Sequence, residues 1–537
     1  MRLKIIAKKN TNEGWFFMDK KQVNKNTGEP KVIELNLSAT VAVIIAIIVL
    51  IITVTSVKVI TTIIAADENK KMNNDTQAAN ERVTYVNSTL KDESGNIVNE
   101  TDADGNVIQV PVPKGYSASK IEGETTASKG FVIYEGDVDW STILVDSKST
   151  QSNVAIDEPA FDDDLVVINE KLDEPAFPDD LIVINENMPE SDTVQDTNID
   201  VNTSDATTND TTTNDDTTTD TTVPTQEEIN IFNLQKTRNQ YVWVPVDDPS
   251  RIYGVDSKGK IWGKLYNFSS TGRKAYNWTE TNGIMNITSQ TSYREPNVLQ
   301  STTYDRDGCP YMHIFGLGET RYEMLSQELE QNYYEIIESI KKYGGFYIGR
   351  YETGGWNGAV VRKMDTHISR NSWYTMYKKC LTLKGTNTDV KTSMIFGNLW
   401  DETLEWLVKS GATISDGTTL TYQLVRSDST KWGNYFNATF KYIAANAEMP
   451  LMTKTKEKSK STRIPAGSAE YTKVNNIYDM AGNVWDWTTE TYSTDRRVYR
   501  GASYFDYGYR NGYGNPAADR SEYYPNYSSD FINVRLS

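Results

Sequence analysis

The longest apolar stretch of the chain lies near its N-terminus. Residues 38–57 read SATVAVIIAIIVLIITVTSV, twenty positions without a charged side chain. An α-helix rises about 1.5 Å per residue, so twenty residues span the roughly 30 Å hydrocarbon layer of a bilayer. The apolar Val59-Ile-Thr-Thr-Ile-Ile-Ala65 continues the run beyond Lys58, whose amine can reach the interface. The pattern predicts one transmembrane helix over residues 38–65.

The charges beside this helix predict its orientation. Residues 1–37 carry eight Lys and Arg against four Asp and Glu, so the positive-inside rule places this segment in the cytoplasm and the rest of the chain outside. A cleavable signal peptide is disfavoured because the apolar run is long and starts late. A type IV prepilin leader is a further alternative, since Glu34 precedes the apolar run, although Glu29-Pro30 stands where a Gly-Phe processing site is expected.

The C-terminal half has a mixed pattern of helix and strand. Apolar residues recur with a period near 3.6 over Glu319 to Lys342, where Gly344-Gly345 follows, and again over Asn398 to Ser410. Short strands are predicted at 107–113 and 131–135, and most other segments are short and rich in Tyr, Thr and Gly. The pattern favours an α+β domain.

Two polar regions separate these elements. Residues 66–105 have little periodicity and predict a flexible stalk, and residues 138–237 form an acidic insertion without Lys or Arg between Leu172 and Gln235. The insertion contains a tandem duplication, 157–170 and 173–186, in which each copy is either a short apolar strand or a disordered repeat. The Thr-, Asp- and Asn-rich stretch from Ser191 to Thr225 cannot bury a core and predicts a disordered linker.

Composition narrows the possible functions. The net charge is -18 and the chain shows no basic patch, which argues against a nucleic-acid partner. Only two cysteines, Cys309 and Cys380, and two histidines, His313 and His367, are present. The cysteines are either buried apolar residues or one disulfide, and the spacings support no zinc, haem or iron site. Ten of the 12 Trp follow residue 238, so the core is expected there.

The most specific motif stands near the C-terminus. Tyr478-Asp-Met-Ala-Gly-Asn-Val-Trp-Asp-Trp487 joins a turn to two tryptophans at i, i+2, which lie on one face of a strand, and Val498-Tyr-Arg-Gly-Ala-Ser-Tyr504 follows. Four further motifs lie upstream: Tyr241-Val-Trp-Val-Pro245, Tyr293-Arg-Glu-Pro-Asn297, Lys342-Tyr-Gly-Gly-Phe-Tyr-Ile-Gly-Arg-Tyr-Glu-Thr353 and Ser393-Met-Ile-Phe-Gly397. In these motifs residues 238–537 resemble the formylglycine-generating enzymes, or sulfatase-modifying factors. The resemblance implies a variant of the C-type lectin fold.

The same resemblance argues against the family's oxidase activity. Those enzymes bind copper through a cysteine pair between the Gly-Gly-Ser turn and an Ala-Ala-Arg-like segment. Here that interval reads FDYGYRNGYGNP, and Asn511 and Pro516 stand where the sulfurs are expected. Without thiolates no soft copper site forms, so we expect no copper and no catalytic residues.

A calcium site is the second property that the resemblance implies. In the family this site uses a side chain three residues before the Gly, two main-chain carbonyls and the carboxylate after Trp. The matching positions are Asp479, Gly482, Val484 and Asp486. Calcium accepts such mixed oxygen ligands at about 2.3 to 2.6 Å, although a turn held by Asp hydrogen bonds without metal explains the same residues.

Tyrosines dominate the last segment. Tyr, Asn, Ser, Gly and Arg alternate there with few aliphatic residues, a composition typical of antibody-like binding surfaces. It also resembles the variable region of retroelement-diversified target proteins, several of which use this fold, while a structurally ordinary Tyr-rich lobe is the alternative. The predicted ligand-binding residues are Tyr504, Tyr507, Tyr509, Arg510, Asn511, Tyr513, Tyr523 and Tyr524.

Together these observations predict a membrane-anchored, catalytically inactive binding module. The expected fold class is α+β, a formylglycine-generating-enzyme-like variant of the C-type lectin fold preceded by one transmembrane helix and a disordered acidic linker. The expected segments are 1–37 cytoplasmic, 38–65 transmembrane, 66–105 stalk, 106–137 a short β segment docking on the C-terminal domain, 138–237 acidic insertion, and 238–537 the enzyme-like domain. The predicted partners are the membrane and an extracellular protein or glycan. A pilus-like or envelope subunit is the main alternative, and an active enzyme of the family is a weaker one.

Overall fold

The computed structural model describes about two thirds of the chain. The described residues are 2–10, 14–17, 31–36, 82–145, 223–288, 295–296, 321–355, 359–385, 387–450, 452–492, 496–510, 514–525, 527, 529–530 and 532–537. Near the N-terminus β1 (Arg2–Asn10), β2 (Gly14–Phe17) and β3 (Lys31–Asn36) form an antiparallel sheet in the order β2-β1-β3. The predicted transmembrane helix and both duplicated segments lie outside the described residues. Within those residues, no helix combines the length and the apolar character needed to cross a bilayer.

A four-stranded sheet joins sequence segments that are a hundred residues apart. Its order is β17-β10-β9-β8, formed by Gly345–Gly349, Gln240–Pro245, Val132–Glu135 and Tyr116–Ala118. β9 pairs with β10 in the register Val242↔Val132, although the acidic insertion separates them in sequence. The segment 106–137, expected to dock on the C-terminal domain, therefore contributes strands to its sheet.

Part of the predicted stalk is folded. Residues 82–105 contribute β4 (Val83–Asn87), β5 (Thr89–Lys91) and β6 (Ile97–Asn99), and β4 pairs with β7 (Gln109–Pro113). The polar residues that suggested a flexible stalk form tight turns instead. The Oδ1 atom of Asp92 accepts from the amides of Ser94 and Asn96 at 2.9 and 2.8 Å, and Asp102 repeats this geometry in the next turn. The stalk prediction is wrong for this part of the chain.

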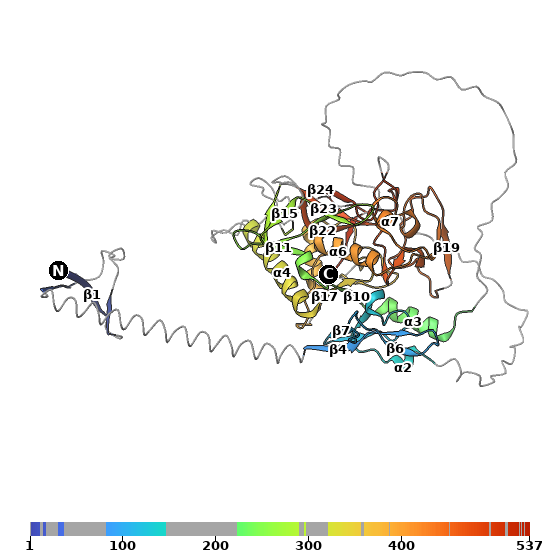
Figure 1. The fold of residues 1–537 in the computed structure, drawn as a ribbon, viewed down its shortest axis with the longest axis horizontal. Coiled ribbons are helices and arrows are strands. Elements are labelled where there is room, and N and C mark those ends of the chain that lie inside the picture. The colour runs from blue at the N-terminus through green and yellow to red at the C-terminus, as the bar shows by residue number, and fades with distance from the viewer. Residues whose placement is uncertain are drawn as a thin grey trace, which may run out of the picture.

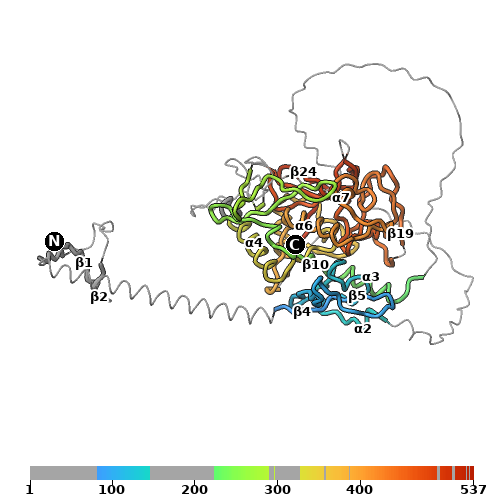
Figure 2. The backbone as a smooth tube through the Cα atoms, in the orientation of Figure 1, coloured from blue at the N-terminus to red at the C-terminus, as the bar shows by residue number. Residues whose placement is uncertain are grey.

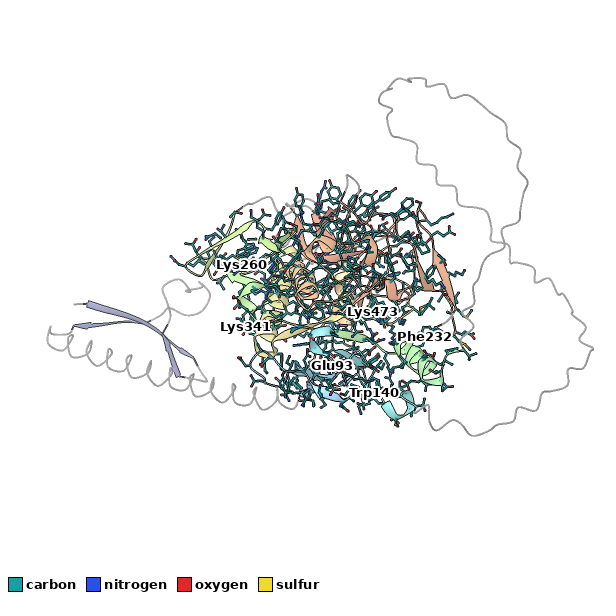
Figure 3. All side chains as sticks on the ribbon, turned by 45° about the vertical axis from the view of Figure 1, so that its right-hand side comes forward. Glu93, Trp140, Phe232, Lys260, Lys341 and Lys473 are labelled. Atoms are coloured by element: carbon teal, nitrogen blue, oxygen red, sulfur yellow. The ribbon has the colours of Figure 1, made fainter. Side chains whose placement is uncertain are left out.

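The end of the predicted linker is also folded. Residues Gln226–Thr237 form α3, which begins at a capping box: Thr225 Oγ1 accepts from the Glu228 amide and the Glu228 carboxylate accepts from the Thr225 amide. Phe232 and Leu234 of this helix are buried. α3 lies beside α2 (Trp140–Ile143), and Figure 3 shows Phe232 and Trp140 on these neighbouring helices.

Three larger helices lie in the C-terminal half. They are α4 (Arg321–Tyr343), α5 (Trp373–Thr382) and α6 (Gly397–Lys409), and the short α7 (Tyr422–Arg426) follows. The periodicity predicted α4 and α6 to within two residues at each end. α6 is buried from Gly397 to Leu407, because the two sheets and their loops surround it (Figure 1).

The second four-stranded sheet carries the C-terminal motifs. Its order is β24-β23-β22-β25, formed by Arg520–Tyr523, Arg496–Arg500, Trp485–Tyr492 and Ile532–Val534, with β22 and β25 parallel. β24 is one of the two edge strands and lies at one end of the molecule, whereas β4 to β7 lie at the opposite end (Figures 1 and 2).

Short strands and 3₁₀ turns fill the loops between these elements. The strands are β11 (Tyr253–Val255), β12 (Ile261–Gly263), β13 (Tyr266–Phe268), β14 (Arg273–Ala275), β15 (Trp278–Thr281), β16 (Ile284–Ile287), β18 (Phe440–Ile443), β19 (Thr453–Lys456), β20 (Lys473–Val474) and β21 (Ile477–Tyr478). The 3₁₀ turns are η1 (Ala127–Lys129), η2 (Pro249–Arg251), η3 (Thr430–Trp432) and η4 (Glu470–Thr472).

Arg535 ties the two sheets together. Its guanidinium is completely buried. Nε donates to Asp486 Oδ2 at 3.1 Å, Nη1 donates to the Gly349 carbonyl at 3.0 Å, and Nη2 donates to the carbonyls of Tyr478 and Asp479 at 2.8 and 3.0 Å. One side chain thus links β17, β22 and the turn between β21 and β22.

We predict that R535M lowers the free energy of unfolding by about 3–5 kcal/mol. Burial raises the pKa of Asp486 to about 8 even beside Arg535. The substitution removes the charged hydrogen-bond donor of this buried group and of three buried carbonyls. The control is R370A, because Arg370 pairs with Asp530 while its side chain is 75% exposed, and exposed pairs contribute little. Urea unfolding of the full chain measures both variants. Equal stability of R535M and the unmodified chain would show that this contact is not a structural requirement.

Candidate functional site

The turn between β21 and β22 has a left-handed backbone. Asp479, Gly482 and Asn483 have φ of 57°, 71° and 66°. A Cβ at Gly482 would lie 2.2 Å from the Asn434 carbonyl oxygen, so only glycine fits there. Beyond the turn Trp485 and Trp487 contact the same ring, that of Tyr499, at centroid distances of 4.7 and 5.2 Å. The one-sided placement predicted from their spacing is therefore present.

A buried polar cluster supports this turn. His367 Nε2 lies 2.7 Å from Glu352 Oε2, and Asn483 Nδ2 lies 2.6 Å from the same oxygen. The Val484 amide donates to Glu352 Oε1 at 3.1 Å. Burial raises the pKa of Glu352 well above its ordinary value, with a further contribution from Asp479, and burial lowers the pKa of His367 to about 4. Because the two groups touch and burial opposes both charges, the pair holds one proton near neutral pH.

The predicted calcium residues lie at this turn. Asp479 and Asp486 are buried, as are Gly482 and Val484. Asp479 Oδ2 accepts from the Gly467 amide at 2.9 Å, and Asp486 Oδ2 faces Arg535. The cation beside Asp486 is thus the Arg535 guanidinium, which contacts two carbonyls of the same turn. The described residues contain no group of three or more His, Cys, Asp and Glu side chains placed to hold a metal. Calcium binding at this turn stays a prediction.

The position of the family's cysteine pair has no thiol. Pro516 is buried and Asn511 lies outside the described residues. Cys309 lies outside the described residues. Cys380 is free and completely buried in α5, where burial raises the pKa of its thiol. A thiol with a raised pKa inside a core is a poor nucleophile and a poor metal ligand.

The tyrosine-rich segment after Gly501 has a firmly held backbone. The amides of Phe436 and Ser429 donate to the carbonyls of Asp506 and Gly508 at 2.9 and 2.8 Å, and the Arg510 amide donates to the Ser427 carbonyl at 2.8 Å. A Cβ at Gly508 would lie 2.7 Å from the Thr430 nitrogen, so the segment lies directly against η3.

Asp506 links two parts of the same segment through its carboxylate. Its Oδ2 accepts from the amide and hydroxyl of Ser503 at 2.9 and 2.7 Å, and its Oδ1 accepts from Asn515 Nδ2 at 2.8 Å. The Asn515 amide donates to the Tyr507 carbonyl at 2.9 Å. The two arms on either side of residues 511–513 are therefore fixed to each other.

The side chains of this segment differ in exposure. Tyr504 is only 8% exposed, so its predicted place on an exposed surface is wrong: its ring packs on the neighbouring Phe505 and its amide bonds to Asn483. Tyr507 and Tyr509 are half-buried and contact each other, and Arg510 pairs with Asp519 while half of its side chain remains exposed. Asn511 and Tyr513 lie outside the described residues. Phe505, which sequence reasoning missed, is 53% exposed.

A second aromatic group lies at the end of β24. Tyr523 and Tyr524 are 39% and 44% exposed. Tyr523 contacts Tyr527 at a centroid distance of 4.2 Å, and the Arg496 guanidinium lies 5.1 Å from the centroid of the Tyr524 ring. Burial raises the pKa of Tyr499, and Asp506, Glu522 and Tyr527 add to this shift. Both groups belong to the tyrosine-rich segment, and each keeps exposed side chains. We call Phe505, Tyr507, Tyr509, Arg510, Tyr523 and Tyr524 the aromatic face.

Comparison with known proteins agrees with the C-terminal motifs. Residues 399–536 match a family model described as "Sulfatase-modifying factor enzyme 1-like domain". This part of the chain is therefore similar to that family. Its match begins in α6 and ends at Leu536, so it includes the turn, the aromatic face and Arg535. No curated protein matches the chain.

Among solved structures, one neighbour is Treponema denticola variable protein 1. It is 14% identical, and the alignment covers 55% of this chain and 94% of that chain with a TM-score of 0.18. At this score the two folds are not shown to correspond.

We predict that the His367–Glu352 pair limits stability at alkaline pH. Above about pH 6.5 the unfolded chain releases the proton that the folded pair keeps, so the free energy of unfolding falls by ~1.4 kcal/mol per pH unit. Between about pH 4.5 and 6.5 both states hold one proton on the pair. Below that range the unfolded chain binds a second proton at a higher pH than the folded chain does, because the pKa of His367 in the folded chain is about 4.

The test is E352Q, which cannot ionise at this position. In this variant the pair should no longer lower the free energy of unfolding at alkaline pH. The free energy of unfolding should instead begin to fall below about pH 6.5, because His367 is then the only group of the pair that binds a proton. Urea unfolding from pH 5 to 9 measures both proteins. Parallel stability curves for E352Q and the unmodified chain would contradict the shared proton.

Proposed function

We propose that this chain is a surface-displayed, non-catalytic binding module that contacts its ligand through the aromatic face. The observation that carries the proposal is the combination of a fixed backbone with exposed rings. Main-chain hydrogen bonds hold residues 506–510 against residues 427–437, while Phe505 and Arg510 keep about half of their side-chain surface exposed.

This combination favours binding on energetic grounds. Tyr and Phe have two side-chain torsions each, so they offer a large contact area at a small cost in conformational entropy. A backbone that is ordered before binding loses little further freedom when the ligand arrives. Arg510, and Arg496 beside the Tyr524 ring, add hydrogen-bond donors that suit a protein or a glycan.

The non-catalytic assignment rests on the chemistry at the former cysteine positions. Pro516 has no group that transfers electrons or binds copper, and the buried Cys380 lies in α5, outside this segment. Within this proposal the domain at 238–537 is a formylglycine-generating-enzyme-like variant of the C-type lectin fold whose ligand surface replaces the copper site. Calcium at the Asp479 turn would be structural.

The placement of the face suits display from a membrane. β24 lies at the end of the molecule opposite β4 to β7, which follow the N-terminal part of the chain (Figure 1). A chain anchored through residues 38–65, with its N-terminus in the cytoplasm, would thus direct the aromatic face away from the bilayer. This orientation is part of the proposal.

We predict that the triple substitution F505S, Y523S and Y524S removes binding without unfolding the chain. Exposed substitutions usually change stability by within about 0.5 kcal/mol, whereas hot-spot aromatic residues contribute ~2 kcal/mol or more to binding. A glycan array and a displayed random-peptide library, each tested against the purified full chain, supply ligands for the affinity measurement.

The matched control is Y85S. Tyr85 is 49% exposed and lies in β4, at the other end of the molecule. Ligands should bind the Y85S variant as tightly as the unmodified chain and the triple variant at least thirtyfold more weakly. Ligands that bind the triple variant normally, or a triple variant that no longer folds, would refute the aromatic face as the binding surface.

A further inference from the structure

A lysine side chain is buried against the loop that precedes β18. Lys456, the last residue of β19, is only 1% exposed. It lies opposite Phe440 in the β18–β19 register, and the Phe440 ring stacks on Tyr471 at a centroid distance of 4.6 Å. Among the described residues, none provides a carboxylate that pairs with the Lys456 amine. A positive charge buried without a counter-charge is costly unless hydrogen bonds compensate for it.

Three main-chain carbonyls receive the Lys456 amine. They belong to Tyr435, Phe436 and Ala438: Nζ bonds to the first oxygen and lies 3.1 and 2.9 Å from the other two. An ammonium has three N–H donors and no acceptor, so this arrangement uses every donor. Burial lowers the pKa of Lys456 to about 8, so the amine is mainly charged at neutral pH. Hydrogen bonds from a charged donor are stronger than those between neutral groups. We call residues 435–438 the supporting loop.

The supporting loop also holds the tyrosine-rich segment. The Phe436 amide donates to the Asp506 carbonyl at 2.9 Å, and Asn437 Oδ1 accepts from the Gly508 amide at 3.1 Å. The Phe436 ring lies edge-on to the Tyr507 ring, with 5.3 Å between the centroids. Tyr507 belongs to the aromatic face. The supporting loop therefore connects the buried ammonium to the residues that carry this face.

We propose that Lys456 positions the aromatic face: its ammonium fixes the supporting loop, and the loop fixes residues 506–508. The inference rests on the proposed function, in which that face binds the ligand. Lys456 is a positioning residue and not a ligand contact, because its amine is buried and bonds to the three carbonyls. Removing the ammonium should therefore weaken binding, although the ammonium does not touch the ligand.

The first test replaces the ammonium with an apolar group of similar length. In K456M the amides of Phe436 and Gly508 should exchange at least tenfold faster than in the unmodified chain, while the amides paired between β22 and β23 keep their protection. The affinity for peptides or glycans selected on the unmodified chain should fall at least tenfold. The matched control is K441M, because Lys441 is an exposed residue of β18 in the same hairpin. It should change neither exchange nor affinity.

Chemical rescue separates the hydrogen bonds from simple packing. K456A removes the last three carbons and the nitrogen of the side chain, which together correspond to n-propylammonium. Adding this cation to K456A should restore slow exchange at the Gly508 amide and raise the affinity again. Tetramethylammonium at the same concentration has the same charge but no N–H donor, so it should restore neither.

Two results would overturn the proposal directly: equal exchange at Gly508 in K456M and the unmodified chain, or equal rescue of K456A by the two cations. Unfolding of K456M, or loss of protection between β22 and β23 as well, would also overturn it, because Lys456 would then support the whole fold. Faster exchange at Gly508 with unchanged affinity would support the positioning role. The failure would then lie in the aromatic face as the binding surface, which the triple substitution tests separately.

Discussion

The buried guanidinium of Arg535 is the contact on which the C-terminal domain most depends. It neutralises Asp486 and bonds to carbonyls of β17 and of the turn before β22. A carboxylate inside a core is costly unless a cation and hydrogen-bond donors meet it. The same side chain satisfies main-chain oxygens that no strand partner reaches. The last strand, β25, is thereby fixed beside β22, and the motif turn is fixed above the first sheet.

Other polar contacts extend this framework toward the surface. Glu352 accepts from the Val484 amide of the turn. The Asn483 carbonyl accepts from the Tyr504 amide at the start of the tyrosine-rich segment. Asp506 then closes that segment, and Asn437 and Ser427 fix its outer part. The backbone of residues 503–510 is therefore held by a series of buried and part-buried hydrogen bonds. This rigidity is the physical basis for proposing that the face binds a ligand.

Local patterns predicted much of the fold. The apolar periodicity located α4 and α6, and the spacing of Trp485 and Trp487 placed both rings against Tyr499. The Thr225–Glu228 capping box was also present in the sequence and would have predicted α3, had the acidic composition around it not suggested a linker. Similarly, each Asp-x-x-Gly-Asn turn, at Asp92 and at Asp102, signals a hairpin within the segment interpreted as a stalk.

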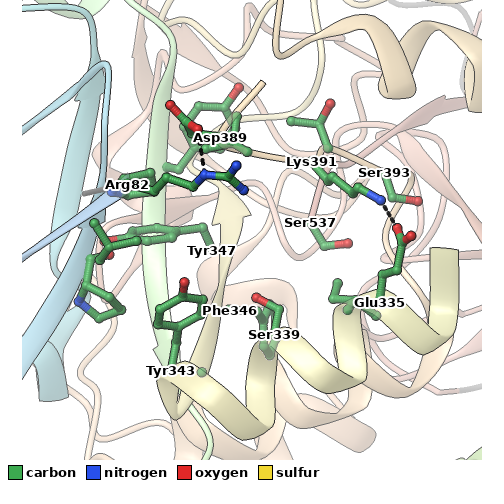
Figure 4. Close-up of a pocket in the computed structure, with 18 of the residues that line it drawn as sticks. Arg82, Glu335, Ser339, Tyr343, Phe346, Tyr347, Asp389, Lys391, Ser393 and Ser537 are labelled. Carbon is green, nitrogen blue, oxygen red and sulfur yellow. Dashed lines mark hydrogen bonds and ion pairs between the residues drawn. The ribbon is translucent and has the colours of Figure 1, made fainter. Parts of the chain in front are cut away.

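Features that depend on distant segments were beyond such reasoning. Arg535 meets Asp486 across 49 positions, so its place beside the predicted calcium residues could not be inferred from either motif. A run of tyrosines does not say which rings face the solvent, which is why Tyr504 was misplaced and Phe505 overlooked. The cavity lined by β4, β7, the β8-β9-β10-β17 sheet, α4 and residues 388–393 (Figure 4) requires segments far apart in sequence to meet, and no local pattern encodes that meeting.

Amide hydrogen exchange tests most directly the claim that a rigid segment presents the aromatic face. Exchange at the amides of Tyr504, Gly508 and Arg510, which all donate hydrogen bonds, should be slowed to a degree similar to the amides paired between β22 and β23. Such protection requires that the segment open only together with the sheet beneath it. Exchange at these three amides close to the rate of an unstructured peptide, with the sheet still protected, would contradict the account.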